Sequence, residues 1–378
     1  MSKALLITND FPPRPGGIQS YVHALATRLP ADSLVVYTAS WKNDEEQRRF
    51  DAAQPFPIVR HPRSLLLPSP WTARRSQELV REHGVESVWF GAAAPFALLA
   101  NAVRAAGAQR VVASTHGHEV GWSMTPGARQ ALRRIGSTVD TVTYVSQYAL
   151  RRVRRAFGPG VDFVRLAPGV DAERFQPDPQ AREAMREQHR VGEAPVLLCL
   201  ARLVPRKGQD VLIGAMPRIL REVPDALLVI VGSGPCEKHL RRLAEQHGVA
   251  DRVRFVGRVQ EEELPAWYAM ADVFAMPCRT RGRGLDVEGL GIVFLEASAV
   301  GLPVIAGDSG GAPETVREGE TGTVVSGRAV PDVANAAVRL LSDKLCASKM
   351  GVAGRAWVQE SWSWDASAQT LAELLRLS

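Results

Sequence analysis

The sequence predicts an α/β fold made of two doubly wound domains. Short apolar runs alternate with segments of helical periodicity in the first half of the chain, and the same alternation restarts at Val196. Between the two series, residues 168–179 are rich in proline and show no periodicity. Alternating strands and helices favour a parallel sheet covered on both faces, and 378 residues exceed what one core usually holds.

The first element is a buried strand over residues 3–9, a continuous apolar run. Residues 10–17 contain three prolines and two glycines, which end the strand and predict a loop. After Gly17 the apolar positions follow helical spacing. They are Ile18, Tyr21, Val22, Leu25 and Leu29. The order is therefore strand, glycine loop, helix.

The rest of the first domain repeats this order. Further strands are expected near 34–38, 85–90, 110–115 and 141–145, with helices near 71–83, 93–106, 126–136 and 147–157. Parallel sheets of this kind bind ligands at the carboxyl ends of their strands. The loops after Asn9, Phe90, Thr115 and Val145 are thus the places where we expect functional residues.

The second domain is predicted from a second series of apolar runs. Strands are expected at 196–200, 227–231, 253–256, 272–276, 303–306 and 322–325, with helices near 207–222 and 236–247. Three helical segments close the chain, at 330–342, 345–360 and 364–377. We predict a first domain over 1–168, completed by a C-terminal helix at 363–378, and a second domain over 169–362.

The charge is unevenly distributed. Residues 1–168 carry 21 Lys/Arg against 12 Asp/Glu, a balance of +9, whereas the whole chain has a net charge of +6. Seven arginines lie on two successive predicted helices, and an apolar segment, 65–71, precedes Arg74 and Arg75. This pattern favours peripheral contact with an anionic membrane surface. No nucleic-acid-binding pattern accompanies the arginines, and a merely solvated basic face remains an alternative.

The chain carries no apolar run long enough to span a bilayer, and its first residues lead into a strand rather than a signal peptide. A cytoplasmic location at the inner face of the membrane is therefore expected. The four cysteines are widely scattered, so neither a disulfide framework nor a zinc site is predicted. No protein partner can be deduced.

Two carboxylates flank a glycine-rich opening at Glu288 and Glu296. If a helix begins near Gly291, its first amides can hold a phosphate, while Glu288 stands at the mouth of the loop and Glu296 more than a turn inside. A sugar nucleotide would fit such a cradle. Taken alone, the segment is better explained as an ordinary core helix whose glutamates face solvent.

Cations gather at a second loop of the same domain. Arg202, Arg206 and Lys207 follow the strand at 196–200, where they suit a diphosphate. In the first domain His116 and His118 follow the strand at 110–115, and hydrogen bonding to a polar substrate explains them better than a metal. No G-x-S-x-G elbow indicates a hydrolase, and Gly232-Ser-Gly234 lacks the full dinucleotide fingerprint.

Together these motifs resemble the retaining glycosyltransferases of family 4, which have the GT-B fold of two Rossmann-like domains facing a central cleft. The resemblance covers essentially the whole chain. Four segments, at 8–14, 89–95, 114–122 and 275–282, are more narrowly similar to the actinobacterial mannosyltransferases that act on phosphatidylinositol monomannoside. That likeness implies GDP-mannose as the donor, an anionic inositol phospholipid as the acceptor, and neither a cofactor nor a metal.

The resemblance also implies residue roles. Glu288, His116, Arg202 and Lys207 would be catalytic, Glu288 and His116 by contacting the transferred sugar and the two cations by neutralising the leaving diphosphate. Glu296 would hold the ribose, and Asp10 and His118 the substrates. The remaining donor contacts would come from Gly16, Gly17, Arg258, Val259, Gly291, Ile292 and Val293.

Two alternatives remain at this point. One is a family 4 transferase that uses another nucleotide sugar or a soluble acceptor such as an inositol phosphate. The other is a non-catalytic nucleotide-binding membrane module. In the front-face mechanism that the resemblance implies, the leaving phosphate itself takes the acceptor proton, so the protein mainly positions and stabilises charge.

Overall fold

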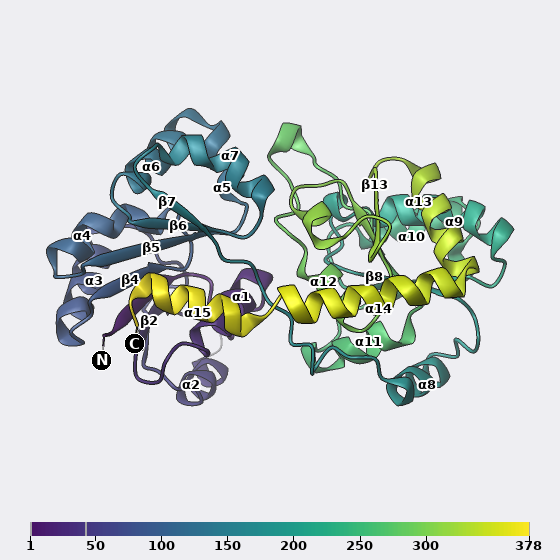
Figure 1. The fold of residues 1–378 in the computed structure, drawn as a ribbon, viewed down its shortest axis with the longest axis horizontal. Helices are drawn as coiled ribbons and strands as arrows, with labels where there is room; N and C mark the ends of the chain where they lie inside the picture. Colours follow the sequence, from purple (N-terminus) through teal and green to yellow (C-terminus); the bar gives the residue numbers. More distant parts are fainter. Residues whose placement is uncertain (1, 42–43, 378) are drawn as a thin grey trace. The chain divides into compact units, whose positions relative to one another are not determined.

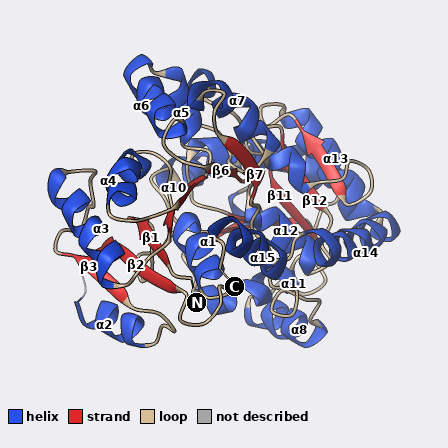
Figure 2. Ribbon diagram, turned by 60° about the vertical axis from the view of Figure 1, so that its left-hand side comes forward, coloured by secondary structure: helices blue, strands red, loops and turns tan. Residues whose placement is uncertain are grey.

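The computed structural model describes residues 2–41 and 44–377, and the chain divides into two compact units. Unit 1 comprises Met1–Gly169 together with Trp364–Ser378, and unit 2 comprises Val170–Ser363. The sequence-based prediction placed these boundaries after residues 168 and 362. Each unit contains one parallel sheet with helices on both faces, as Figures 1 and 2 show.

The sheet of unit 1 has seven strands in the order β3-β2-β1-β4-β5-β6-β7, all paired in parallel. The strands are β1 (Ala4–Thr8), β2 (Leu34–Ala39), β3 (Ile58–His61), β4 (Ser87–Phe90), β5 (Arg110–Thr115), β6 (Thr141–Tyr144) and β7 (Asp162–Arg165). The strand order reverses between β1 and β4. Such a reversal opens a crevice at the carboxyl edge, where ligands of doubly wound sheets bind.

The helices of unit 1 divide between the two faces of this sheet. They are α1 (Gly17–Ala26), α2 (Asp44–Ala52), α3 (Pro70–Glu82), α4 (Ala100–Ala105), α5 (Glu119–Met124), α6 (Pro126–Gly136), α7 (Gln147–Phe157) and α15 (Trp364–Leu375). Helices α3, α4, α5, α6 and α7 contribute to one buried cluster, and α1 and α15 to the other. Helix α15 ends the chain yet belongs to unit 1, where it packs on α1, β4 and β5 (Figure 1).

The two edge strands, β3 and β7, were not predicted. Each has only four residues, and neither is fully buried, so neither shows the continuous apolar run that marks the interior strands. The short helices α2 and α5 were missed as well. A strand at the edge of a sheet packs on fewer neighbours, which leaves a weaker sequence pattern.

The sheet of unit 2 has six parallel strands in the order β10-β9-β8-β11-β12-β13. They are β8 (Val196–Leu200), β9 (Leu227–Val231), β10 (Val253–Gly257), β11 (Val273–Met276), β12 (Val304–Gly307) and β13 (Gly322–Val325). The helices are α8 (Pro179–Gln188), α9 (Gln209–Glu222), α10 (Glu237–Gln246), α11 (Leu264–Met270), α12 (Ile292–Ala299), α13 (Val330–Ser342) and α14 (Lys344–Ser361). Here the strand order reverses between β8 and β11.

Two glycines allow the loops after β11 and β12 to pack backbone against backbone. A Cβ atom on Gly307 would lie 1.9 Å from the carbonyl oxygen of Cys278. A Cβ atom on Gly310, whose φ is 59°, would lie 1.8 Å from the carbonyl oxygen of Glu288. Neither contact is possible for a residue with a side chain, because backbone atoms cannot move aside as a flexible side chain can. These glycines therefore hold the Glu288 loop against the end of β12.

None of the helices within 2–41 and 44–377 is both long and apolar enough to cross a membrane.

Candidate functional site

The carboxyl ends of β8, β11 and β12 bring three loops of unit 2 together. Residues 201–208 follow β8, residues 277–291 follow β11, and residues 308–311 follow β12. The strands are neighbours in the sheet, and the strand order reverses between β8 and β11. The loops therefore meet at the position where a doubly wound sheet binds its ligand.

Glu288 is the buried carboxylate of this site. Its Oε2 lies 2.7 Å from Nζ of Lys207 and 3.6 Å from Nε of Arg206. Its backbone N–H donates to Oγ of Ser309 at 3.2 Å, and its carbonyl oxygen accepts from the N–H of Gly311 at 3.0 Å. Two cations from the β8 loop thus stabilise a carboxylate from the β11 loop, which a buried charge requires.

The structure separates the two cations that the sequence grouped together. Lys207 is largely buried and is committed to Glu288. Arg202 is exposed, and within the described chain its side chain forms no ion pair. Its guanidinium is therefore available to an incoming diphosphate, whereas Lys207 acts on a ligand together with Glu288. Arg206, which the sequence placed in the same loop, joins the Glu288 cluster instead.

Helix α12 begins at Ile292, four residues after Glu288. Gly291 precedes the helix with φ 89° and ψ 73°, a left-handed conformation that glycine adopts without strain. No side chain caps this end, so the N–H groups of Ile292 and Val293 have no acceptor within the helix. The positive end of α12 is thus suited to a phosphate oxygen, and phosphate binding by Gly291, Ile292 and Val293 stays a prediction.

Glu296 lies more than a turn inside α12 and is half-buried. Its Oε2 accepts a hydrogen bond of 2.7 Å from the hydroxyl of Tyr268 on α11. Burial raises the pKa of Glu296 to about 7, although the hydrogen bond from Tyr268 lowers it. Near neutral pH this group is consequently divided between a carboxylic acid and a carboxylate, and a ligand with hydroxyl groups would favour the carboxylate.

Replacing Glu296 with glutamine is expected to stabilise the ligand-free protein at high pH. A folded-state pKa raised from 4.5 to about 7 means that the native state binds the extra proton, so stability falls as pH rises through that window. The loss reaches up to about 3 kcal/mol above pH 7. Urea unfolding of both proteins from pH 5 to pH 8 should show a growing difference, and parallel curves would contradict the assignment.

In unit 1, His116 follows β5 at the carboxyl edge. Its Nε2 lies 2.6 Å from the carbonyl oxygen of Gly91, the residue after β4. Since a carbonyl only accepts, Nε2 carries the proton, and burial lowers the pKa of His116 and keeps the ring neutral. Nδ1 of the neutral ring is then a hydrogen-bond acceptor. This fits contact with a hydroxyl group of a sugar.

A buried carboxylate holds the turn that carries the two histidines. Oε2 of Glu119 accepts from the backbone N–H of His116 at 3.1 Å and of Gly117 at 3.2 Å. Its Oε1 lies 3.2 Å from Nε2 of His118, whose ring stacks at 6.3 Å from that of His116. Glu119 is fully buried and opposes the fall in the pKa of His116. No role for Glu119 was predicted from the sequence.

The remaining predicted residues of unit 1 lie in the loop after β1. Oδ1 of Asp10 accepts a hydrogen bond of 2.7 Å from Nε2 of Gln19 on α1, and Asp10 is close enough to influence the pKa of His116. Gly16 and Gly17 are exposed at the N-terminus of α1. Asp10 and His116 thus share one edge of the first sheet. Arg258 and Val259 belong to unit 2 and directly follow β10 at its carboxyl end.

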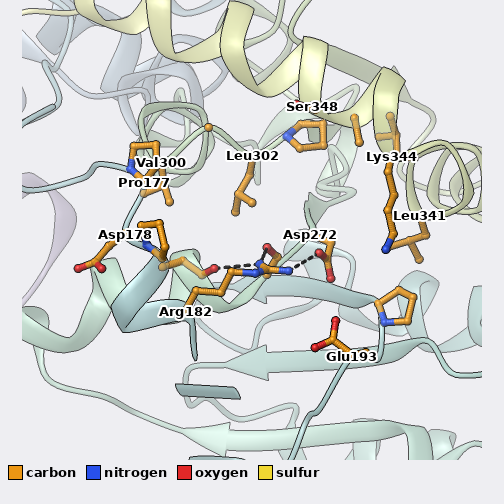
Figure 3. A pocket seen from close by; sticks show the side chains of 18 residues that line it. Pro177, Asp178, Arg182, Glu193, Asp272, Val300, Leu302, Leu341, Lys344 and Ser348 are labelled. Carbon is orange, nitrogen blue, oxygen red and sulfur yellow. Dashed lines mark hydrogen bonds and ion pairs between the residues drawn. The ribbon is translucent and has the colours of Figure 1, made fainter. Parts of the chain in front are cut away.

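A hollow of about 480 Å³ in unit 2 lies at the other edge of the sheet (Figure 3). Pro195, Asp272 and Pro303 line it, and they precede β8, β11 and β12. Arg182, the cation at its centre, already forms an ion pair, because its Nη2 lies 2.6 Å from Oδ1 of Asp272. The hollow is therefore separate from the Glu288 site.

Known proteins with similar sequences and folds identify the family of this chain. Residues 15–174 match the family model described as Glycosyltransferase Family 4, and residues 181–357 match the one described as Glycosyl transferases group 1. The crystal structure of Anabaena Alr3699/HepE in complex with UDP has a TM-score of 0.83 over 99% of both chains at 20% identity, a likeness in fold.

Two relatives are similar over their whole length. The chain is 57% identical to the GDP-mannose-dependent alpha-(1-6)-phosphatidylinositol monomannoside mannosyltransferase of Mycobacterium tuberculosis, covering 100% of this chain and 98% of that one. It is 51% identical to the corresponding monoacylated-substrate enzyme of Corynebacterium glutamicum, covering 99% and 98%. The predicted fold class and the predicted family are both confirmed. This chain belongs to the family 4 glycosyltransferases.

Proposed function

We propose that this glycosyltransferase moves mannose from GDP-mannose to an inositol hydroxyl of a phosphatidylinositol monomannoside, giving the dimannoside. The observation that carries the proposal is the 57% identity to an enzyme of that name, which extends over the whole chain. It includes the unit that holds Glu288 and the unit that holds His116. The donor, the acceptor and the residue roles below are all parts of this proposal.

The side chains of unit 2 suit the nucleotide sugar. The exposed guanidinium of Arg202 and the free amides of Ile292 and Val293 would stabilise the negative charge that develops on the leaving diphosphate. Glu288, fixed by Lys207, would orient the hydroxyl groups of the mannose. Glu296 would hold the ribose. In this scheme the departing phosphate oxygen takes the proton of the acceptor hydroxyl, so no side chain of the protein has to act as the base.

The decisive experiment supplies purified protein with GDP-mannose and either phosphatidylinositol monomannoside or soluble inositol phosphate. We expect a mannolipid product from the first acceptor only. Product from the soluble acceptor alone would overturn the proposed acceptor. A thermal-shift panel tests the donor independently, because GDP should raise the melting temperature and UDP should not.

A lipid acceptor requires contact with a membrane, and one loop of unit 1 has the composition for it. Leu65, Leu67 and Trp71 are 50%, 53% and 51% exposed. Leu66 between them is fully buried, and the side chain of Asn9 accepts from its N–H at 2.7 Å and donates to its carbonyl at 3.0 Å. These two hydrogen bonds fix the backbone of Leu66, so that its side chain points inward and those of Leu65 and Leu67 point outward.

The position of this apolar loop (residues 65–71) supports its role. It follows β3 and is bound by Asn9, which follows β1, so it lies at the carboxyl edge of the first sheet. Asp10 lies in the same β1 loop. A tryptophan with two exposed leucines is typical of a segment that rests in the interface of a bilayer. The peripheral membrane contact that we propose, on the cytoplasmic face, would bring a lipid headgroup to this edge.

Replacing both Leu67 and Trp71 with serine is expected to weaken binding to anionic vesicles at least tenfold, since each large apolar side chain contributes about 1.5–3 kcal/mol when fully buried. Transfer to a short-chain acceptor in solution should stay within twofold. Leu345→Ser and Val352→Ser together provide a control, because these exposed residues lie on α14 of unit 2. Unchanged vesicle binding in the loop variant would contradict the proposal.

A further inference from the structure

Helices α5, α6 and α7 of unit 1 form a surface with an unusual charge balance. Residues 120–161 contain seven arginines and a single acidic residue, Asp140. Asp140 is already engaged, because its Oδ2 lies 2.7 Å from Nη2 of Arg104 and accepts from the N–H of Val111 at 2.7 Å. This segment therefore offers no free carboxylate to its own arginines.

The seven arginines of this segment have no acidic partners in the described chain. Within the described chain none of them forms an ion pair. They are Arg129, Arg133 and Arg134 on α6, and Arg151, Arg152, Arg154 and Arg155 on α7. Helix α3 of the same unit differs, since Arg74 and Arg75 pair with Glu78 on their own helix. The excess of positive charge on α6 and α7 is thus a local feature rather than a general one.

A hollow of about 340 Å³ opens among these three helices. Arg129 and Arg133, one helical turn apart on α6, line it together with Gln130. The other lining residues are Ser123, Met124, Pro126 and Ala156. The hollow therefore combines two guanidinium groups and an amide with an apolar wall.

The first turn of α6 adds donors at the same place. Pro126 occupies the first helical position, and the side chain of Thr125 does not cap the helix. The amides of Gly127 and Ala128 precede the first intrahelical hydrogen bond, which runs from the N–H of Arg129 to the carbonyl of Thr125 at 2.8 Å. This end of an 11-residue helix carries partial positive charge beside the guanidinium groups.

We propose that this hollow binds the phosphodiester of an anionic glycerophospholipid in the bilayer, distinct from the lipid that is glycosylated. Guanidinium forks match phosphate oxygens in pairs, and Met124, Pro126 and Ala156 would contact the glycerol and the first acyl carbons. A nucleic acid would also supply phosphates, but it needs no apolar wall. The inference rests on the membrane contact in the proposed function and not on the identity of the donor.

The separation from the acceptor follows from the helix geometry. Ser146 caps α7 and follows β6, so it lies at the carboxyl edge of the sheet, the edge that also carries His116 after β5. Ala156, in the wall of the hollow, lies ten residues further along α7, roughly 15 Å from Ser146 at the rise of an α-helix. A lipid phosphate bonded to the reacting inositol would have to lie within about one sugar ring of that edge. We assign the hollow to a second lipid molecule on the ground of this distance along α7, although Ser123 and Met124 in its wall belong to α5, which begins directly after His118.

The lipid site also lies on a suitable face. Helices α3, α6 and α7 all pack into the same buried cluster, through Val80, Leu132 and Val153. The helix that follows the apolar loop and the helices that line the arginine hollow thus cover the same face of the sheet of unit 1. A bilayer could contact both, the loop by insertion and the hollow through its phosphate groups.

The test exchanges arginine for lysine, which keeps the charge and removes the fork. We expect Arg129→Lys with Arg133→Lys to weaken binding to phosphatidylcholine vesicles containing phosphatidylglycerol about tenfold, which corresponds to about 1.4 kcal/mol. Arg151→Lys with Arg155→Lys, on the open face of α7, should change it less than twofold.

Equal effects of the two lysine exchanges, or no effect of either, would show diffuse attraction and overturn the site. A higher KM for a short-chain acceptor in the Arg129/Arg133 variant would place the acceptor in the hollow and overturn its assignment to a second lipid. If the Arg129/Arg133 variant lost binding to DNA but kept binding to vesicles, the ligand of the hollow would be a nucleic acid and not a lipid. If the wild-type protein transfers no mannose, the proposed function fails, while the vesicle comparison still decides the hollow.

Discussion

Replacing Glu288 with glutamine is expected to lower kcat about 10²–10³-fold, the usual effect of removing one preorganised polar group from a transition state. Glutamine keeps the size of the side chain but cannot accept hydrogen bonds at both terminal atoms. It also withdraws the negative charge that holds Lys207 and Arg206 in place. Orientation of the sugar and the electrostatics around the diphosphate would both be lost.

The measurement is single-turnover transfer of mannose at saturating GDP-mannose, so that weaker binding is separated from slower chemistry. Asp286→Asn is the matched control. Asp286 lies in the same loop, 3.7 Å from Arg206, and is markedly more exposed than Glu288. The control removes the same charge and should keep transfer within threefold. Full turnover by the Glu288 variant would favour a nucleotide-binding module without catalysis.

The strands of the two sheets show best how much of the fold could be predicted from the sequence. All six strands of unit 2 were predicted. The four interior strands β8, β9, β11 and β12 are almost entirely buried, and burial on both faces leaves a continuous apolar run, whereas the edge strands β10 and β13 are less buried. In unit 1 the interior strands were predicted and the edges β3 and β7 were missed. The carboxyl-edge loops followed from the strand positions, so Glu288, Lys207 and His116 could be named in advance as candidates.

What the sequence could not provide was the pairing of side chains between loops. Lys207 and Glu288 meet because β8 and β11 are neighbours, and strand order in a sheet leaves no trace in local periodicity. Tyr268 has the pattern of a core aromatic, and only the structure places its hydroxyl on Glu296. Glu119 was visible beside His118, but the burial that makes it a structural carboxylate depends on how α5 packs.

The ion pair between Lys207 and Glu288 leads to the second large prediction. The two side chains are only 12% and 8% exposed, so methionine at position 207 would leave a buried carboxylate without its principal partner. Arg206, at 3.6 Å, would compensate in part. We therefore expect Lys207→Met to lower the free energy of unfolding by about 3 kcal/mol, the lower limit for breaking a buried ion pair.

Adding Glu288→Gln to Lys207→Met should restore much of this loss, because the uncompensated charge is then removed together with its partner. Urea unfolding of the wild type, both single variants and the double variant forms a cycle, for which we expect a coupling energy of about 1–3 kcal/mol. The restored protein should nevertheless remain inactive. Additive losses in stability would mean that the pair contributes little to the fold. The predicted result instead separates two functions of the same contact. Lys207 stabilises the folded protein by pairing with the buried carboxylate of Glu288, and Glu288 then orients the hydroxyl groups of the mannose.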